Sequence, residues 1–339
     1  MDTITIQNLE KSRIEITGEL PAEELEKHRS QAIKDLGKDA EFDGFRKGHV
    51  PEKILVEKIG EDRVLLEMAE LALAQAYPRI IVEKKLEAIG RPEITLTKLA
   101  KGNPLGFKIV TAVLPEVKLP KDYAKLAGAA IAGIDESVEA TDEEAVQMID
   151  TIRKNRAIKV EGQDEPQLPE LTDEFAKSLG QFESVDDLKS KVKENIALEK
   201  AGRLKEKRRL KAVEAIGEKT EIVIPDIMIE SETEKMLGEM RFQIEQMGLT
   251  FDDYLKHIQK TEAALKADWQ DDAAKRVRFG LIMDAIAKTE KIEAPEEELK
   301  KEVEHLMSHH QHADPMRISS YAEHLIINEK VFQFLENQK

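Results

Sequence analysis

The first twenty residues alternate between apolar and polar side chains, which is the period of a β-strand. Isoleucines recur at every second position in the segments Thr3–Gln7 and Arg13–Thr17. Such alternation predicts strands that turn one face toward a core. The pattern returns in the segments Glu93–Leu99 and Phe107–Leu114. We therefore predict four short strands that form a small sheet.

The residues between these two pairs of strands follow a helical pattern instead. Leu25 and Ile33 lie on the apolar face of a helix predicted over Pro21–Lys38. Two further helices are predicted over Glu52–Lys58 and Glu61–Lys85. The order strand, strand, helices, strand, strand is typical of an α+β domain with antiparallel pairing.

The second half of the chain has the pattern of long helices. The longest is predicted over Ser184–Ile216, and it would span ~50 Å at about 1.5 Å per residue. Other helices are predicted over Pro225–Met247, Phe251–His257, Glu262–Thr289, Pro295–His310 and Ile318–Asn337. Long helices with few aromatic residues are suited to arms that project around an open concavity.

Two stretches without a periodic pattern separate these parts. Residues 115–140 are rich in Pro, Gly and Ala, which predicts an extended connector. Thr141 and Glu144 have the spacing of a capping box and predict the start of a helix, whereas Ile158–Pro169 is predicted to be a polar linker. The predicted fold is multidomain and elongated, with an α+β N-terminal domain at 1–114, an extended connector plus helix at 115–157, and a mostly α-helical C-terminal domain with extended helical arms at 158–339.

Composition argues against a disulfide-bonded, membrane-spanning or secreted protein. The chain has no cysteine, which excludes disulfides and thiolate metal sites. It has no apolar run near the ~20 residues that span a bilayer, and its start lacks the pattern of a secretory signal, so we expect a soluble, cytoplasmic protein.

Residues 1–115 hold 18 Lys and Arg against 20 Asp and Glu, so they carry −2 of the net charge of −16. A nearly neutral first domain can approach a polyanion that would repel the acidic remainder.

One short loop carries the strongest functional signal. Residues 44–51 read GFRKGHVP, and the candidate binding residues are Gly44, Phe45, Arg46, Lys47, Gly48 and Pro51. Both glycines can adopt a positive φ at no steric cost, so the backbone can turn sharply and present the aromatic ring and the two cations outward. Such a tip suits a surface that mixes phosphate, carboxylate and apolar groups. The alternative is an ordinary turn between two helices whose charges are solvated.

The octapeptide, at this distance from the amino terminus, resembles the signature loop of trigger factor, a family of bacterial ribosome-associated chaperones. Two further segments, Thr141–Ala157 and Leu168–Gly180, resemble the helix after that family's first domain and the opening of its C-terminal domain. The resemblance implies that the loop binds the large ribosomal subunit near the exit tunnel, through ribosomal protein, with a contribution of ribosomal RNA left open. It also implies nascent or unfolded polypeptides as partners, no membrane and no cofactor, and it leaves open a homodimer of the free protein.

The function implied by the resemblance is that of an ATP-independent chaperone that shields apolar segments of nascent polypeptides and assists their folding. Most members of the family carry an inserted prolyl-isomerase domain of the FK506-binding type, which needs on the order of a hundred residues. The linker at Ile158–Pro169 leaves no room for it, so we expect no enzymatic activity. A prolyl isomerase remains the alternative, and an export chaperone of the cell envelope is a second one.

Methionine and phenylalanine side chains of the second half are candidates for contact with client polypeptides. Methionine is flexible and polarizable, so a patch built from it can accept many apolar segments. The candidates are Met228, Met236, Met240, Phe242, Met247, Phe279, Phe332 and Phe334. Apolar residues at helical spacing more often pack inward, so each of them has a place in the helical core as its alternative.

A cluster of histidines is the remaining chemical feature. It consists of His305, His309, His310 and His312, and the first two have the i, i+4 spacing that places two imidazoles on one helix face. Such a pair can bind zinc or nickel, but no third ligand at a characteristic spacing completes the site. We therefore expect no resident metal and keep a metallochaperone role as an alternative. Neither a nucleophile elbow nor a phosphate-binding glycine loop is found, so hydrolysis and ATP dependence are not expected.

Overall fold

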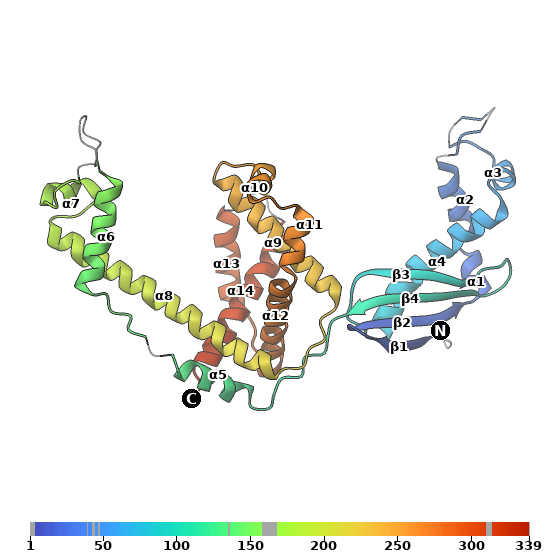
Figure 1. Ribbon diagram of the computed structural model, residues 1–339. Helices are drawn as coiled ribbons and strands as arrows, with labels where there is room; N and C mark the ends of the chain where they lie inside the picture. The colour runs from blue at the N-terminus through green and yellow to red at the C-terminus, as the bar shows by residue number, and fades with distance from the viewer. Residues whose placement is uncertain are drawn as a thin grey trace. The chain divides into compact units, whose positions relative to one another are not determined.

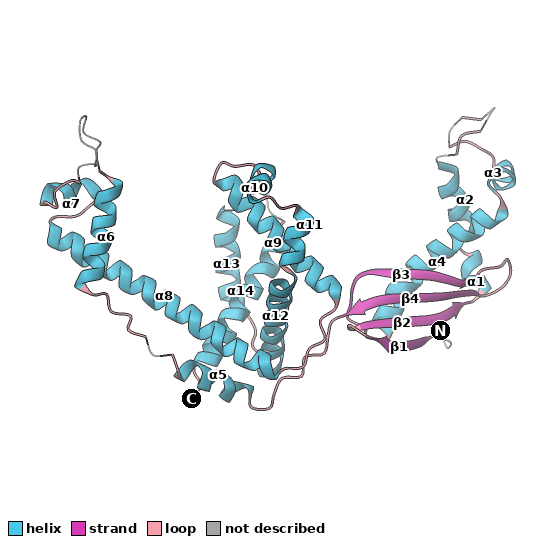
Figure 2. Ribbon diagram, viewed as in Figure 1, coloured by secondary structure: helices cyan, strands magenta, loops and turns pink. Residues whose placement is uncertain are grey.

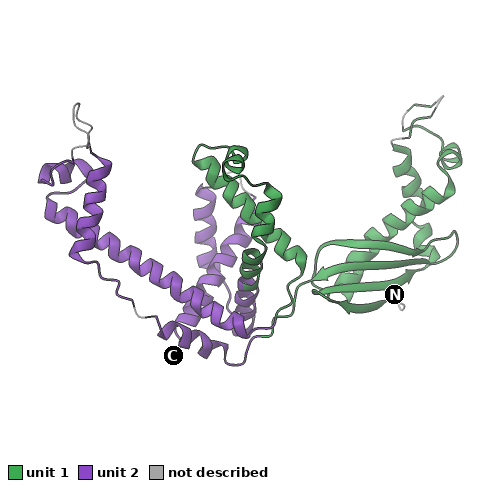
Figure 3. Ribbon diagram, in the orientation of Figure 1, with its two compact units in different colours: residues 1–118, 222–278 green, residues 119–221, 279–339 purple. Residues whose placement is uncertain are grey.

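The computed structural model describes residues 4–38, 40–42, 45–46, 48–134, 136–157, 168–309 and 314–338. Contacts divide the chain into two compact units, which Figure 3 distinguishes by colour. Unit 1 comprises residues 1–118 and 222–278, and unit 2 comprises residues 119–221 and 279–339. Unit 1 therefore contains both the sheet and a helical segment from far along the sequence. The three-part domain division expected from the sequence stays a prediction.

A four-stranded antiparallel sheet in the order β1-β2-β4-β3 lies in unit 1 (Figure 2). The strands are β1 at Thr5–Leu9, β2 at Arg13–Leu20, β3 at Ala88–Lys98 and β4 at Leu105–Val113. In the centre of the sheet, Ile16 of β2 lies opposite Ile109 of β4, and both side chains are fully buried. The alternation in the sequence thus corresponds to one buried face, as a period of two requires.

The helices of this part are α1 at Ala22–Glu26, α2 at Arg29–Lys38, α3 at Glu52–Ile59 and α4 at Glu61–Glu83. Helix α4 crosses the buried face of the sheet (Figure 1), and the other three pack against α4. Met68, Leu73 and Ile80 of α4 belong to the same core cluster as Ile16 and Ile109 of the sheet. This shared core holds α4 across the sheet, and the predicted α+β architecture is confirmed.

The predicted continuous helix over Pro21–Lys38 is wrong, because the chain leaves the helix at Lys27 and His28. Neither residue is a glycine or a proline, so the sequence contains no local helix breaker there. The break allows Leu25 of α1 and Ile33 of α2 both to reach the core of the sheet. Burial on both sides of the break, rather than local propensity, explains the interruption.

The second part of unit 1 is helical. It contains α9 at Asp226–Gln246, α10 at Phe251–Ile258, α11 at Glu262–Asp268 and the beginning of α12 at Gln270–Glu290. Leu237, Ile244, Phe251 and Leu265 form its core. The helix predicted over Glu262–Thr289 is interrupted at Trp269, whose side chain packs against this core.

Unit 2 consists of helices. It contains α5 at Tyr123–Ala132, α6 at Asp142–Asn155, α7 at Asp173–Leu179, α8 at Val185–Lys219, α13 at Glu296–His309 and α14 at Pro315–Glu336, together with the end of α12. The capping box that starts α6 is confirmed: the Glu144 amide donates to Thr141 Oγ1 at 3.2 Å, and the Thr141 amide donates to Glu144 Oε2 at 2.9 Å. Ser184 caps α8, which is 35 residues long and continues beyond the predicted end.

The segment expected to be an extended connector contains a helix, so that part of the prediction is wrong. Tyr123 and Ala127 of α5 are buried, and α5 packs on α8 and α14. Gly128 lies so close to the end of the chain that a Cβ there would be 3.0 Å from the carbonyl oxygen of Gln338. Small residues, which suggested a linker, here permit close packing of a helix. Of the predicted linker Ile158–Pro169, residues 158–167 lie outside the described part.

Candidate functional site

The loop between α2 and α3 carries the predicted docking residues. Phe45, Arg46, Gly48 and Pro51 belong to the described part of the chain, whereas Gly44 and Lys47 lie outside it. Two backbone hydrogen bonds form turns in this loop: the amide of Phe45 donates to the carbonyl oxygen of Phe42 at 3.0 Å, and that of His49 donates to that of Arg46 at 2.9 Å. The described part of the loop is therefore a sequence of tight turns.

These turns place the Arg46 side chain in solvent and leave Phe45 half-buried. Gly48 has a φ of +77°, and a Cβ there would lie 3.3 Å from the carbonyl oxygen of Lys38. Only glycine adopts this backbone without strain. Phe42 and Val50, on either side of the tip, pack against the core of the sheet and its helices. The base of the loop is thus anchored while the Arg46 cation remains accessible.

An ion pair joins α2 to α4, the helices on either side of the segment that contains the loop and α3. Glu61, the first residue of α4, pairs with Arg29 of α2 and with Lys101, which follows β3. Hydrogen bonds from Arg29 and Lys101 lower the pKa of Glu61 to about 2. The carboxylate is therefore charged at neutral pH, which favours its place in the first turn of a helix.

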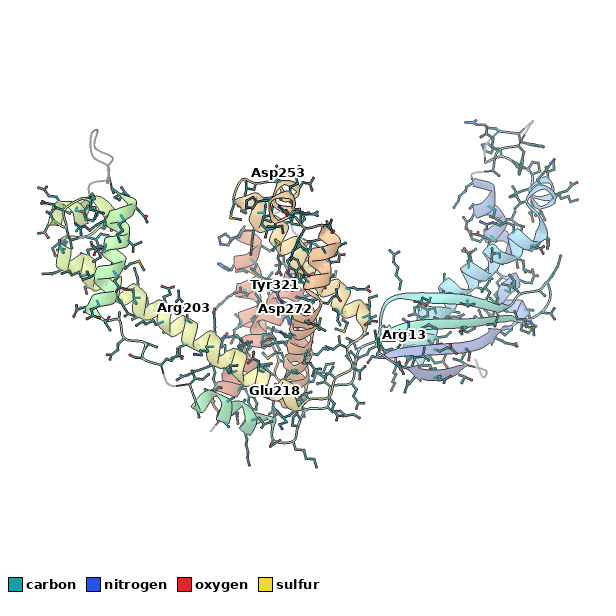
Figure 4. All side chains as sticks on the ribbon, viewed as in Figure 1. Arg13, Arg203, Glu218, Asp253, Asp272 and Tyr321 are labelled. Atoms are coloured by element: carbon teal, nitrogen blue, oxygen red, sulfur yellow. The ribbon has the colours of Figure 1, made fainter. Side chains whose placement is uncertain are left out.

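Two of the predicted client-contact residues are strongly exposed. Phe242 is 62% exposed and Met247 is 68% exposed, near the turn that joins α9 to α10. Leu249, in the same turn, is 53% exposed and was not predicted. Asp253, which Figure 4 labels, marks the adjoining helix α10. Phe242, Met247 and Leu249 lie within eight consecutive residues around this turn and are here called the α9–α10 patch.

The other predicted client-contact residues are half-buried. Met240 packs against the core of the α9–α11 helices. The rings of Phe279 and Phe332 lie 6.0 Å apart, and the Arg209 guanidinium lies 4.6 Å from the centre of the Phe332 ring. The remaining half-buried candidates are Met228, Met236 and Phe334. A role of these eight residues in client contact stays a prediction.

Exposed apolar side chains also occur where the sequence did not indicate them. They include Leu198 at 66% and Leu210 at 50% on α8, and Met316 at 78% and Tyr321 at 55% on α14. Figure 4 labels Tyr321 on α14 and Arg203 on α8. The sequence gives only a weak signal for Leu198, because of the two residues four positions away on a helix Glu194 is charged and Gly202 is not. Apolar residues outside a helix's buried stripe remain exposed.

The histidine pair on α13 is also described. The rings of His305 and His309 lie 5.1 Å apart, and His305 Nδ1 is 4.0 Å from Glu302 Oε1. His310 and His312 lie outside the described part. Over the described ranges, no group of three or more histidine, aspartate or glutamate side chains is arranged to hold a metal ion. Among the same residues, no helix is long and apolar enough to cross a membrane.

Two family profiles match this chain. One, described as "Bacterial trigger factor protein (TF)", matches residues 2–152 and includes the sheet, α1–α5 and the docking loop. The other, described as "Bacterial trigger factor protein (TF) C-terminus", matches residues 184–336. The chain belongs to the trigger factor family. The two matched segments leave only residues 153–183 between them.

Individual trigger factors are similar over most of their length. That of Geobacillus kaustophilus is 28% identical over 379 aligned positions, covering 88% of this chain and 89% of the relative. That of Halothermothrix orenii is 24% identical and covers 97% of both chains. A solved structure described as "Promiscuous Substrate Recognition in Folding and Assembly Activities of the Trigger Factor Chaperone" is 19% identical and covers 99% of this chain with a TM-score of 0.55, which shows the shared fold.

These matches confirm the resemblance, the predicted fold class and the predicted function of a ribosome-associated chaperone. The alignment to the Geobacillus trigger factor is longer than this chain of 339 residues. Some residues of that relative therefore have no counterpart here. The matched parts are the N-terminal and C-terminal regions of trigger factor.

Proposed function

We propose that this chain is an ATP-independent trigger factor that docks on the large ribosomal subunit through the loop at residues 44–51. The exposed Arg46 on an anchored turn is the observation that carries the proposal. The proposed contact residues are Gly44, Phe45, Arg46, Lys47, Gly48 and Pro51. They would meet ribosomal protein and ribosomal RNA beside the site where a nascent polypeptide emerges.

The physical basis of docking is a cation placed on a loop whose base is anchored by packed side chains. A guanidinium in solvent can bind a phosphate or carboxylate through two parallel hydrogen bonds. The two turn hydrogen bonds on either side of Arg46 reduce the conformational entropy that its backbone would lose on binding. The near-neutral charge of residues 1–115 reduces repulsion from the polyanionic ribosome, whereas the remaining residues carry most of the net charge of −16.

Cosedimentation with ribosomes tests the docking loop. We expect the triple variant F45A/R46A/K47A to lose about ten-fold or more in affinity, since charge-assisted hydrogen bonds contribute roughly 1.5–3 kcal/mol each. Binding of the reference chain should also weaken as salt rises. The matched control is R63A/K84A, which removes two exposed cations from α4 and its end and should bind as the reference does. Equal loss in both variants would overturn the docking assignment.

The chaperone function is proposed to rely on weak contacts with exposed apolar side chains. The α9–α10 patch offers three such side chains, each more than half exposed. Apolar burial contributes about 25 cal/mol per Å², so a few side chains hold a client weakly and release it once it buries its own apolar surface. No nucleotide is needed for such a cycle.

Suppression of aggregation tests this part of the proposal. A chemically denatured protein diluted into buffer without ATP should aggregate less in the presence of the reference chain. The variant F242S/M247S/L249S should suppress aggregation less well, whereas V82S, which removes an apolar side chain that is 77% exposed on α4, should behave as the reference. If the triple variant retains full suppression, the patch does not contact clients.

The proposal also covers isomerase activity, cellular location and dimerisation. The chain is expected to act without prolyl-isomerase activity, so a proline-peptide assay should give the uncatalysed rate. It is expected in the cytoplasm, which cell fractionation tests. Dimerisation of the free chain is decided by sedimentation velocity, where a sedimentation coefficient that rises with protein concentration shows a homodimer.

A further inference from the structure

The turn between β1 and β2 contains two consecutive residues in the left-handed region. Lys11 has a φ of 59° and Ser12 a φ of 50°. The other non-glycine residues with positive φ in the described part, Lys85, Gln259 and Lys291, lie within two residues of a helix end, where this conformation is common. A strand-to-strand turn with two positive φ angles normally carries glycine or asparagine. The Lys-Ser pair is therefore strained and indicates that the two side chains serve another purpose.

Both side chains contact the segment that leads into α9, which belongs to the same compact unit. Lys11 Nζ donates to the two carboxylate oxygens of Asp226 at 3.0 and 2.7 Å. Ser12 Oγ donates to the carbonyl oxygen of Val223 at 2.6 Å. The strained turn thus aims both of its side chains at one short segment. Arg13, labelled in Figure 4, directly follows these two residues.

A glycine on β3 allows the segment that leads into α9 to contact the sheet at a second place. Gly90 lies next to an irregularity in the pairing of β3 with β4. A Cβ at this position would lie 2.3 Å from Ile227 Cδ1, which is closer than any real contact. In its present rotamer, Ile227 therefore occupies the space that a side chain at residue 90 would take. Pro225, between these contacts, is buried.

We propose that the β1–β2 turn is a reversible latch that holds the sheet against the start of α9. Opening of the latch would free the sheet and its loop at residues 44–51 from the α9–α10 helices. This conformational device goes beyond the proposed function, and it does not depend on ribosome or client binding.

Several features make the latch weak enough to open. The Lys11 and Asp226 side chains are 61% and 57% exposed, and such an ion pair contributes little and is screened by salt. A cavity of about 250 Å³, lined by residues that include Arg13, Arg91 and Ile227, remains between the two surfaces.

Distance measurements between two spin labels test the latch. Because the chain has no cysteine, V82C on α4 and K235C on α9 give two unique labelling sites, and both positions are exposed. The reference chain should show one dominant, narrow distance distribution. In G90A, the added methyl group collides with Ile227, so the distribution should become broad, and I227A in the same chain should restore the narrow one.

Gly102 supplies the matched control for G90A. The φ angles of the two glycines are nearly the same, +72° at Gly102 and +73° at Gly90. No atom, however, lies within 4 Å of a Cβ at Gly102. G102A therefore introduces the same backbone strain without the collision and should leave the distribution narrow. If G90A and G102A give the same distribution, Gly90 does not seat Ile227 and the proposal is overturned.

A second variant keeps the test independent of folding defects at the glycines. K11N/S12G installs the residues that a turn with positive φ prefers, so the sheet should not be destabilised, yet both latch contacts are lost. We expect the open fraction to rise about two- to five-fold, as loss of an exposed ion pair implies. An unchanged distance distribution in K11N/S12G, in a variant whose melting temperature is not lowered, would contradict the latch.

Discussion

Arg29 and Glu61 are joined by two parallel hydrogen bonds, from Nη1 to Oε1 at 2.7 Å and from Nη2 to Oε2 at 3.0 Å. Arg29 begins α2 and Glu61 begins α4, so the pair closes the segment that carries the docking loop and α3. Lys101 adds a third hydrogen bond to Glu61 Oε1 at 2.9 Å. The ends of the segment are thus held together by charge, while Phe42 and Val50 anchor it by burial.

The variant E61Q is expected to change how stability depends on pH. The pKa of Glu61 lies near 2 in the folded chain instead of near 4.5, so its contribution is present above about pH 4.5 and disappears as pH falls toward 2. Because the pair is about one-third exposed, we expect only about 1 kcal/mol or less. Urea unfolding between pH 7 and pH 2 measures this. The control E57Q, at an exposed position of α3, should keep the pH dependence of the reference, and an identical curve for E61Q would contradict the role of the pair.

The variant G48A is expected to damage the docking loop specifically. A residue other than glycine at the φ of +77° costs about 1–2 kcal/mol, and the loop can avoid this cost only by changing its turn. G102A, with a φ of +72°, carries a similar cost at the loop after β3. Urea unfolding should show comparable losses of stability for both variants, whereas ribosome cosedimentation should weaken only for G48A. Equal binding by both would show that the shape of the turn is not required.

The variant R209K is expected to destabilise unit 2 although it keeps the charge. Arg209 donates three hydrogen bonds of 2.7 Å, two to Glu329 and one to Glu336, and its guanidinium also stacks on Phe332. Lysine cannot reproduce this fork or the stacking, so we expect a loss of about 2 kcal/mol. The control R203K changes an arginine of the same helix that is 77% exposed. Similar unfolding free energies for both variants would contradict a special role of Arg209.

The variant Y123F is expected to remove a dependence of stability on alkaline pH. Burial and a hydrogen bond to the Glu290 carboxylate raise the pKa of Tyr123. A raised pKa means that the contribution is present below the unfolded value near 10 and is lost as pH rises above it. Y123F should therefore be about 1 kcal/mol less stable at pH 7, with a smaller further loss between pH 9 and pH 11. Y321F, at a residue that is 55% exposed, should follow the reference, and a steeper alkaline loss in Y123F would refute the assignment.

Local sequence patterns determined much of this fold. The alternating isoleucines of β2 set its buried face, because side chains of a strand alternate between two sides. Thr141 and Glu144 determined the start of α6, since both capping hydrogen bonds lie within one helical turn. The same holds for the turn at Gly48, whose positive φ favours glycine. In each case the deciding interaction lies within a few residues.

Only the tertiary structure decided where helices break and which apolar side chains remain exposed. The break at Lys27, the helix that begins at Tyr123 and the interruption at Trp269 depend on burial against segments distant in the sequence. Likewise, Phe242 and Phe332 are the same residue type on predicted helices. Phe332 contacts Phe279 and Arg209, whereas Phe242 is 62% exposed. Burial is a property of the assembled core, and no local pattern encodes which distant surface will cover a side chain.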